Sequence, residues 1–251
     1  MSFEFRYKEL LEIDSTNNYM RKWMQDEPSL PELSVLRALY QTAGRGQVGN
    51  RWESERGKNL TMSLLLRPEG MSVHRQFDIS MVIAVSVAQA LQPYLQEMVK
   101  VKWPNDIYVG DRKMAGILIE NVLRGCDIMT SVAGIGVNVN QQIFLSDAPN
   151  PVSLRQIVGY DVDISTLMQQ IVAMVEIWMA KLRNGGVEEI HRTYIGMMYR
   201  ADGALHNWLL PTGEVLTASI VDTEPTGHII LRDFEGREYR FAFKEVSHMI
   251  V

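Results

Sequence analysis

The chain has 251 residues, of which 46% are hydrophobic and 22% charged, with 18 glycines and 9 prolines. This is the composition of a globular protein with one large or two small domains, and it excludes disordered, collagen-like and repeat architectures. The formal net charge of -5 gives no overall positive field for a phosphate backbone, so no nucleic-acid partner is expected. The single cysteine, Cys126, cannot form an internal disulfide or a zinc site of several thiolates, which favours a reducing compartment.

The N-terminal residues 1–14 mix glutamate, arginine and lysine and contain no apolar stretch of the kind found in signal peptides. The most apolar segment, residues 77–95, contains Asp78, Pro93 and several other polar residues. A membrane span needs about 20 predominantly apolar residues, so this segment is interpreted as a buried helix. We therefore expect a cytoplasmic protein without a membrane span.

The first 140 residues are predicted to combine helices and strands. A helix should start near Ser15, because Asp14 and Thr16 beside it are also capping residue types and residues 17–25 have helical apolar spacing. Residues 41–59 form a glycine-rich polar loop, and a long helix is expected over residues 77–98. The predicted strands are residues 35–40, 60–66, 99–103, 107–109, 115–123 and 128–139.

The pattern changes after Arg200. Two predicted helices, residues 166–182 and 187–197, precede this point, and short alternating runs separated by proline and glycine turns follow it. These runs are residues 216–221, 228–232 and 239–243. They predict a small β-barrel or sandwich of roughly 50 residues. We expect an α+β fold, not a doubly wound parallel sheet, with one domain over residues 1–199 and a second over residues 200–251.

Residues 44–49 match the GxGxxG dinucleotide-binding pattern by letter, but their context does not fit it. A Rossmann turn opens directly into an apolar helix, whereas residues 50–58 are polar and have no helical period. Glycine backbone amides beside cationic side chains suit a phosphate or carboxylate that is covered after it binds. A solvated charged loop is an equally good interpretation at this point. The cationic residues of the loop are Arg45, Arg51, Arg56 and Lys58.

Residues 102–120 predict a β-hairpin that turns at residues 110–112. Asn105 and Asp106 fall at the entrance of its first strand. Lys113 enters the second strand just before two small residues, which let another group approach the backbone. A carboxylate and an ammonium group that meet there could hold an anion, and a plain hairpin is the alternative.

A third segment, residues 134–140, is a glycine-containing strand that ends at Asn138 and Asn140 and again allows close approach to the backbone. A simple strand end explains this segment equally well. The five histidines show no metal-ligand spacing, and no Ser-His-Asp order is readable.

Together these segments resemble the catalytic core of biotin protein ligases. The resemblance spans about residues 13–140, and the Lys-Trp-Pro-Asn-Asp run followed by Lys-Met-Ala-Gly-Ile-Leu is its most specific part. The matching segments are Asp14-Ser15-Thr16-Asn17, Gln41 with Gly44-Arg45-Gly46-Gln47, Lys102-Trp103-Pro104-Asn105-Asp106 with residues 113–118, and residues 134–138.

The resemblance implies a mixed-sheet catalytic domain of the biotin/lipoate ligase type, followed by a small SH3-like barrel. It implies an enzyme that uses ATP with Mg²⁺ to activate biotin as biotinyl-5'-AMP. The biotin would then pass to a lysine of a biotin carboxyl carrier protein or of a biotin-dependent carboxylase subunit. The metal-binding residues are not implied.

Roles carried over from the family fall on matching positions of this sequence. Arg45, Lys113 and Asp106 are the implied catalytic residues: Lys113 contacts the reacting carboxylate and phosphate, and Asp106 steers or deprotonates the acceptor lysine. The implied biotin site is Ser15, Thr16, Asn17, Gln41, Arg45, Gly46, Gln47, Lys113 and Gly116. The implied ATP and adenylate site is Arg45, Trp52, Asn105, Lys113 and Asn138, with Gly116 on the same side.

Two loops are expected to close over the ligands, residues 44–58 over the adenylate and residues 141–152 over adenine. Some members of the family carry a further arginine where this chain has Gln47, so the first loop has one charge less. Some also carry an N-terminal DNA-binding domain, for which we expect no room before Asp14.

Two alternatives stand beside this interpretation. A lipoate ligase or octanoyltransferase resembles the same core, and the Lys-Trp-Pro-Asn-Asp run favours biotin over it. A biotin-binding regulator without turnover is the other, and Arg45, Asp106 and Lys113 argue against it.

Overall fold

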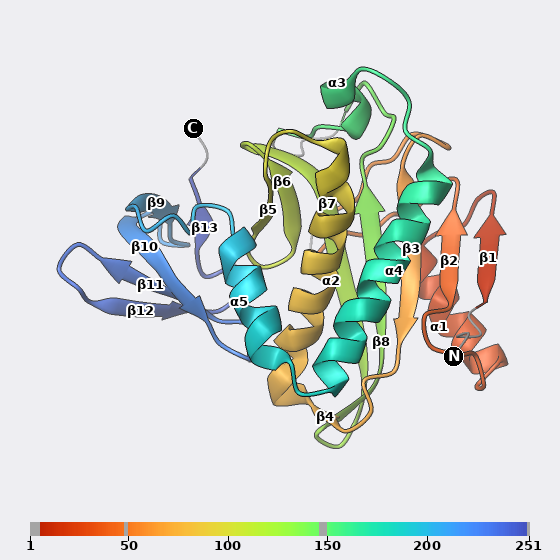
Figure 1. The fold of residues 1–251 in the computed structure, drawn as a ribbon, viewed down its shortest axis with the longest axis horizontal. Coiled ribbons are helices and arrows are strands. Elements are labelled where there is room, and N and C mark those ends of the chain that lie inside the picture. The colour runs from red at the N-terminus through yellow and green to blue at the C-terminus, as the bar shows by residue number, and fades with distance from the viewer. Residues whose placement is uncertain (1–5, 48–49, 146–149, 250–251) are drawn as a thin grey trace.

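The computed structural model describes residues 6–47, 50–145 and 150–249, which form two β-sheets with helices packed on the larger one (Figure 1). The larger sheet has eight strands in the order β1-β2-β3-β8-β7-β6-β5, with β4 beside β8. Strands β1 and β2 are parallel and the other pairs are antiparallel, so the predicted mixed sheet is confirmed. Its strands are β1 (Tyr7–Leu10), β2 (Val35–Ala38), β3 (Leu60–Leu66), β4 (Met71–Ser72), β5 (Val99–Lys102), β6 (Asp106–Val109), β7 (Arg112–Arg124) and β8 (Asp127–Val137).

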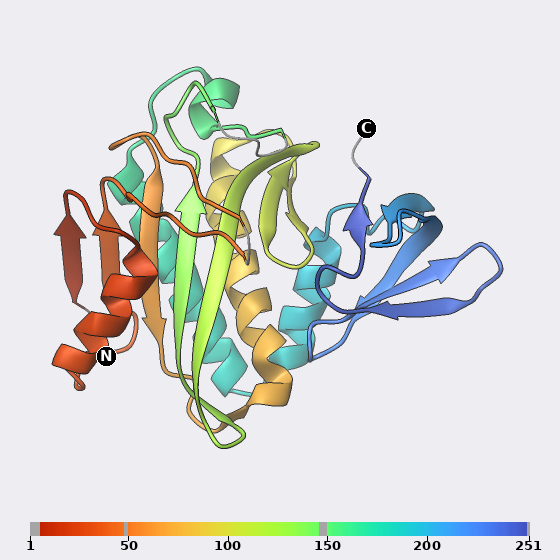
Figure 2. The same ribbon diagram turned by 180° about the vertical axis from the view of Figure 1, so that it is seen from behind.

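Helices cover both faces of this sheet unequally. Helices α2 (Gln76–Leu91), α4 (Ile164–Arg183) and α5 (Val187–Met197) lie on one face (Figure 1), and α1 (Thr16–Asp26) lies on the other (Figure 2). A short helix, α3 (Leu154–Val158), follows the strands. Helix α2 is buried nearly all round, as expected for an apolar helix between the sheet and its outer helices.

The alternation of side chains along β3 separates the two faces. Leu60, Met62, Leu64 and Leu66 belong to the core beneath α2, whereas Leu65 packs with the smaller cluster beneath α1. Because side chains alternate along a strand, Thr61 and Ser63 face the α1 side as well. Strand β3 therefore presents apolar residues to the large core and two hydroxyl groups to the opposite face.

The smaller sheet is antiparallel, with five strands in the order β12-β11-β10-β9-β13. Four of its residues, Trp208, Ala218, Ile229 and Leu231, join the main hydrophobic core together with Val246 of an adjoining loop, so the two sheets are packed together. The predicted second antiparallel unit is confirmed, whereas its closure into a barrel and its boundary at residues 199 and 200 stay predictions. Its strands are β9 (His206–Leu209), β10 (Val215–Thr223), β11 (Ile229–Asp233), β12 (Glu238–Phe241) and β13 (Ser247–His248).

Most predicted elements form close to their expected bounds, and β3 and α5 have the bounds predicted. The long helix is an exception, because α2 ends at Leu91 and a 3-10 turn follows at Gln92–Tyr94, where Pro93 cannot continue the helical hydrogen bonding. In the described part of the chain, no helix is both long and apolar enough to cross a membrane.

One histidine is buried where the two sheets meet. His248 is 8% exposed, and its ring packs on Trp208 with the centroids 3.9 Å apart and the ring planes tilted by 35°. Both ring nitrogens are buried and find no hydrogen-bond partner among the described residues. Burial lowers the pKa of His248 from 6.5 to about 3, and the nearby cations Lys102 and Arg200 act in the same direction.

This burial predicts a loss of stability at acidic pH. Because the folded-state pKa is depressed, the unfolded state takes up a proton first, and stability is lost as the pH falls from about 6.5 towards 3. Each pH unit corresponds to about 1.4 kcal/mol, so His248 should lower the free energy of unfolding by about 2 kcal/mol between pH 6.5 and pH 5. Urea titrations of His248→Phe should lack this part of the pH dependence, whereas the exposed His74→Phe control should keep it. Equal pH dependence in both variants would contradict the assignment.

Candidate active site

A row of residues across the larger sheet forms the floor of a pocket on the α1 side. The strand register places Thr61 opposite Gly136, Gly136 opposite Gly116, and Gly116 opposite Asp106. Residues opposite each other in a sheet present their side chains to the same face. The two glycines therefore leave the centre of the floor bare, with a hydroxyl group at one end of the row and a carboxylate at the other.

The N-terminus of α1 forms one wall. Asn17 is 2% exposed and its amide is fully used: Ser63 Oγ donates to its oxygen at 2.5 Å, and its nitrogen donates to Glu120 at 2.8 Å. A Cβ atom at Gly134 would lie 2.6 Å from this amide, so the glycine is what admits Asn17. The side-chain oxygen of Gln41 accepts from the backbone N–H of Thr16 at 2.7 Å and joins the loop to this wall.

The loop that begins at Gly44 folds back over the floor. Arg45 and Arg51 pair as an isolated antiparallel bridge, and the backbone N–H of Gly46 donates to the Asn50 carbonyl at 3.0 Å. The indole of Trp52 lies against Gly136 and Gly116, where a Cβ at Gly136 would overlap the ring. Its buried Nε1 finds no partner in the described residues, so the ring edge offers a free N–H donor inside the pocket.

The predicted carboxylate and ammonium pair meets at the end of the floor. Lys113 Nζ lies 2.7 Å from Asp106 Oδ1, and the two side chains are 24% and 25% exposed. The hairpin turn at Gly110, with φ of 56°, brings the two strands together. An ion pair this open to solvent can exchange its partners, so Lys113 is available to an incoming anion.

Asn105 fixes the start of β6 against β7. Its side-chain amide donates to the Ile117 carbonyl, and its own carbonyl accepts from the Ile117 N–H at 3.2 Å. Asn105 is 9% exposed, so most of its polar surface serves this pairing. The residue therefore holds the neighbouring Asp106 at the pocket edge.

The segment after β8 forms backbone hydrogen bonds with Lys113. The Lys113 N–H donates to the Asn150 carbonyl at 2.8 Å, and the Val152 N–H donates to the Lys113 carbonyl at 2.9 Å. Asn138 does not line the pocket; its side-chain nitrogen lies 3.5 Å from the same carbonyl. Within the segment 141–152 expected to cover adenine, residues 146–149 lie outside the described residues.

Glu120 of β7 is a carboxylate beside this wall, and it was not predicted as a site residue from the sequence. It pairs with Arg45 at 3.0 Å and with Arg21 at 3.0 Å, while also accepting from Asn17. Its position was readable in principle, because Gly116, Leu118 and Glu120 alternate onto one face of β7. Arg45 is thus held by a carboxylate at the pocket edge.

The structure brings together all the predicted site residues except Asn138. The pocket that they line opens to solvent. Of the four loop cations, Arg45 and Arg51 line it, whereas Arg56 turns away to Glu12 and Lys58 is not among its lining residues. Val48 and Gly49 of the loop lie outside the described residues. The lining residues that were not predicted as site residues are Asn50, Arg51, Thr61, Met62, Ile117, Leu118, Gly134, Ile135 and Gly136.

No group of three or more His, Cys, Asp or Glu side chains within the described ranges could hold a metal ion. A metal needed here would depend on ligands supplied by a bound substrate, such as phosphate oxygens.

Comparison with known proteins identifies the fold and the family. The model of the biotin/lipoate A/B protein ligase family matches residues 11–140, which contain the whole row of the floor. The chain belongs to this family. The biotin/lipoate ligase core thus accounts for the mixed sheet, α1 and the glycine-floored pocket.

Relatives and solved structures agree with this assignment. BirA of Bacillus subtilis, a bifunctional ligase/repressor, is 34% identical over 151 residues, which are 58% of this chain and 46% of that protein. The chain spans about half the length of the BirA proteins it matches. A biotin--[acetyl-CoA-carboxylase] ligase of Paracoccus denitrificans is 28% identical over 242 residues, 91% of this chain and 95% of that protein.

Among solved structures, the chain is similar to the biotin protein ligase from Aquifex aeolicus in complex with biotin and ATP. The TM-score is 0.79 at 25% identity, and the match covers 96% of this chain and 97% of that one. The similarity thus includes the second sheet as well as the ligase core.

The bare floor predicts a graded response to small substitutions. Gly136→Ala should expel the Trp52 indole from the pocket, because the added methyl group occupies the space of the ring. Gly116→Ala should displace the ring less, since a Cβ there would meet it at 3.2 Å. Acrylamide quenching of tryptophan fluorescence should rise in Gly136→Ala and stay lower in Gly116→Ala. The increase should vanish in a Trp52→Phe background, and its persistence there would contradict the placement of the ring.

Proposed function

We propose that the chain is a biotin protein ligase that activates biotin with ATP as biotinyl-5'-AMP and transfers the biotin to a lysine of a biotin carboxyl carrier protein. The observation that carries the proposal is the pocket itself, in which Arg45, Lys113 and Asp106 surround a floor of two glycines. The relatives named as biotin ligases support the same activity.

The first half-reaction needs charge neutralisation and alignment more than acid-base chemistry. The biotin carboxylate is already a nucleophile at neutral pH and attacks the α-phosphorus, forming the mixed anhydride while pyrophosphate leaves. Arg45 and Lys113 would stabilise the charge on the carboxylate and phosphate oxygens. In this account, the substrate anions replace Glu120 and Asp106 as the partners of these two cations. Mg²⁺ bound to the phosphates of ATP would supply further neutralisation.

The second half-reaction needs a base. The acceptor amine is protonated at neutral pH, and it must lose a proton to attack the carbonyl carbon of the anhydride and release AMP. Once Lys113 contacts the phosphate, the Asp106 carboxylate is freed at the edge of the pocket. Asp106 can then accept that proton or orient the amine.

The remaining roles follow the geometry of the pocket. We assign the biotin rings to the wall formed by Ser15, Thr16, Asn17 and Gln41, and the nucleotide to the side of Trp52 and Asn105, with the roles of Gly46, Gln47 and Asn138 as expected from the family. We also propose a cytoplasmic location and, with the net charge of -5, no nucleic-acid partner.

The choice between biotin and a fatty acyl substrate is tested by exchange of labelled pyrophosphate into ATP. We expect exchange that depends on biotin and is at least about a hundredfold faster than with lipoate or octanoate, since a buried polar wall rejects substrates that leave it unpaired. Faster exchange with lipoate or octanoate would identify the alternative transferase activity. No exchange with any of the three, together with tight biotin binding, would indicate a regulator without turnover.

Asp106→Asn should separate the two half-reactions. Transfer to the carrier lysine should fall by roughly a hundredfold or more, because general-base catalysis contributes about that much, while adenylate formation changes little. Single-turnover assays that measure biotinyl-AMP and biotinylated carrier separately distinguish the steps. Glu55→Gln, on the same loop as Trp52 but outside the pocket lining, is the matched control. Equal loss in both steps would make Asp106 a residue that only positions substrates.

A further inference from the structure

The second sheet holds the segment that carries Asp106, although it supplies no side chain to the pocket. Within the described residues, no lining residue lies beyond Gly136 in sequence. Trp103 and Pro104 form the turn between β5 and β6, immediately before Asn105 and Asp106. Contacts with this turn are therefore one route by which the second sheet can influence the chemistry.

Trp103 contacts two loops of the second sheet. Its indole N–H donates to the Gly227 carbonyl at 3.0 Å, in the turn between β10 and β11. Its ring meets Phe243, in the loop after β12, edge to face with centroids 6.1 Å apart. Trp103 is only 5% exposed, so both contacts are made in a largely dry environment. The ring has little freedom to move without moving these loops.

The other side of the turn is fixed by α2 and α5. Tyr194 of α5 is fully buried, and its hydroxyl donates to the Pro104 carbonyl at 3.2 Å. The Tyr194 ring packs edge to face on Phe77 with centroids 5.5 Å apart. A Cβ atom at Gly227 would lie 3.0 Å from the Phe77 ring, so the turn that contains Gly227 also packs against α2. Gly227 has φ of 94°, a conformation that favours glycine.

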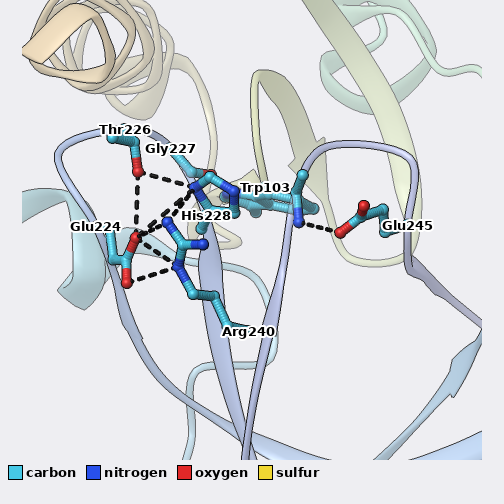
Figure 3. A network of polar contacts seen from close by, with 8 residues as sticks. Trp103, Glu224, Thr226, Gly227, His228, Arg240 and Glu245 are labelled. Carbon is cyan, nitrogen blue, oxygen red and sulfur yellow. Dashed lines mark hydrogen bonds and ion pairs between the residues drawn. The ribbon is translucent and has the colours of Figure 1, made fainter. Parts of the chain in front are cut away.

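Figure 3 shows the polar contacts that hold the turn at residues 224–228, between β10 and β11, in place. Glu224 accepts two hydrogen bonds from Arg240 Nε, at 2.9 and 2.8 Å, and its carboxylate also lies 2.7 Å from the Arg240 Nη2. His228 Nδ1 lies 2.8 Å from the Thr226 hydroxyl and 3.1 Å from Arg240. On the other loop, Glu245 accepts from the Ala242 N–H at 2.7 Å. These bonds tie the two loops into shape on both sides of Trp103.

We propose that Trp103 is a positioning residue through which the second sheet sets the place of Asp106 for transfer to the acceptor amine. The proposal rests on the proposed function and adds a residue to it. Trp103 touches no reacting atom in this account. It fixes the turn whose next residue, Asn105, is bonded to Ile117, and so fixes where Asp106 stands opposite Lys113. Small errors in such positions are costly, since a shift of about 1 Å can reduce a rate about a hundredfold.

The test is Trp103→Phe, which keeps an aromatic ring beside Phe243 but removes the N–H donor to Gly227 together with the second ring of the indole. Transfer to a purified biotin carboxyl carrier domain should fall by about tenfold or more relative to adenylate formation. Discharge of the same adenylate onto hydroxylamine should be unchanged, because hydroxylamine is unprotonated at neutral pH and needs no base. Gly227→Ala, which disturbs the same contact from the other partner, should show the same selective loss.

The matched control is Trp178→Phe. Trp178 is 7% exposed and donates to Gln89 at 2.9 Å, so the variant loses an equivalent buried bond far along the chain from the turn. It should leave the ratio of the two half-reactions unchanged. Equal loss of both half-reactions in Trp103→Phe, or no loss in either, would overturn the positioning role while the ligase function stands. A parent protein that forms no adenylate would instead refute the proposed function, and the positioning role with it.

Discussion

The register of four neighbouring strands is the constraint on which the rest of the site depends. It places Thr61, Gly136, Gly116 and Asp106 in one row, so the absence of two side chains admits the Trp52 ring onto the floor of the pocket, and the end of the row supplies its carboxylate. A shift by one residue in β7 or β8 would turn these glycines to the α2 core and fill the pocket with Ile117 or Ile135. The same alternation that builds the apolar core on one face therefore builds the site on the other.

Two cations around this floor are paired with carboxylates of the protein. Arg45 is paired with Glu120, and Lys113 with Asp106, so both cations are held near their working positions by carboxylates. Both pairs are partly exposed, and such pairs contribute only about 0 to 1 kcal/mol, which makes their exchange for substrate anions inexpensive. In the proposed mechanism, this exchange also gives an order to the chemistry, because an anion bound to Lys113 frees Asp106.

The sequence predicted the fold and most of the site for physical reasons that can be named. Strand and helix periods placed β3 and α5 correctly, and the hairpin glycines marked the turn that brings Lys113 to Asp106. The order of the motifs, matched to the family, predicted that the loop of Arg45 and the N-terminus of α1 share one pocket, and residues of both segments line it. Arg45 and Arg51 of this loop line the pocket, while Arg56 is a surface residue paired with Glu12.

Other features depend on contacts between distant segments, which local pattern does not encode. Glu120 gains its importance only when Asn17 of α1 and Arg45 of the loop, 103 and 75 residues away in sequence, converge on β7. The hydrogen bond of the Trp103 indole joins it to Gly227, which lies 124 residues later in the sequence. The edge strand β1 was missed because Tyr7–Leu10 is short, half exposed and without an apolar run. The nucleotide role of Asn138, expected from the resemblance, stays a prediction; its side chain lies beside the backbone of Lys113.

In the proposed mechanism, biotin and ATP react above the glycine row. The Lys113 ammonium leaves its ion pair with Asp106 and contacts the reacting carboxylate and phosphate. A crystal structure of the chain incubated with biotin and ATP tests this most directly. We expect biotinyl-AMP in the pocket beside Trp52, with Lys113 Nζ within hydrogen-bond distance of the acyl phosphate and no longer paired with Asp106. Adenylate bound elsewhere, or bound in this pocket while Lys113 still pairs with Asp106, would contradict the account.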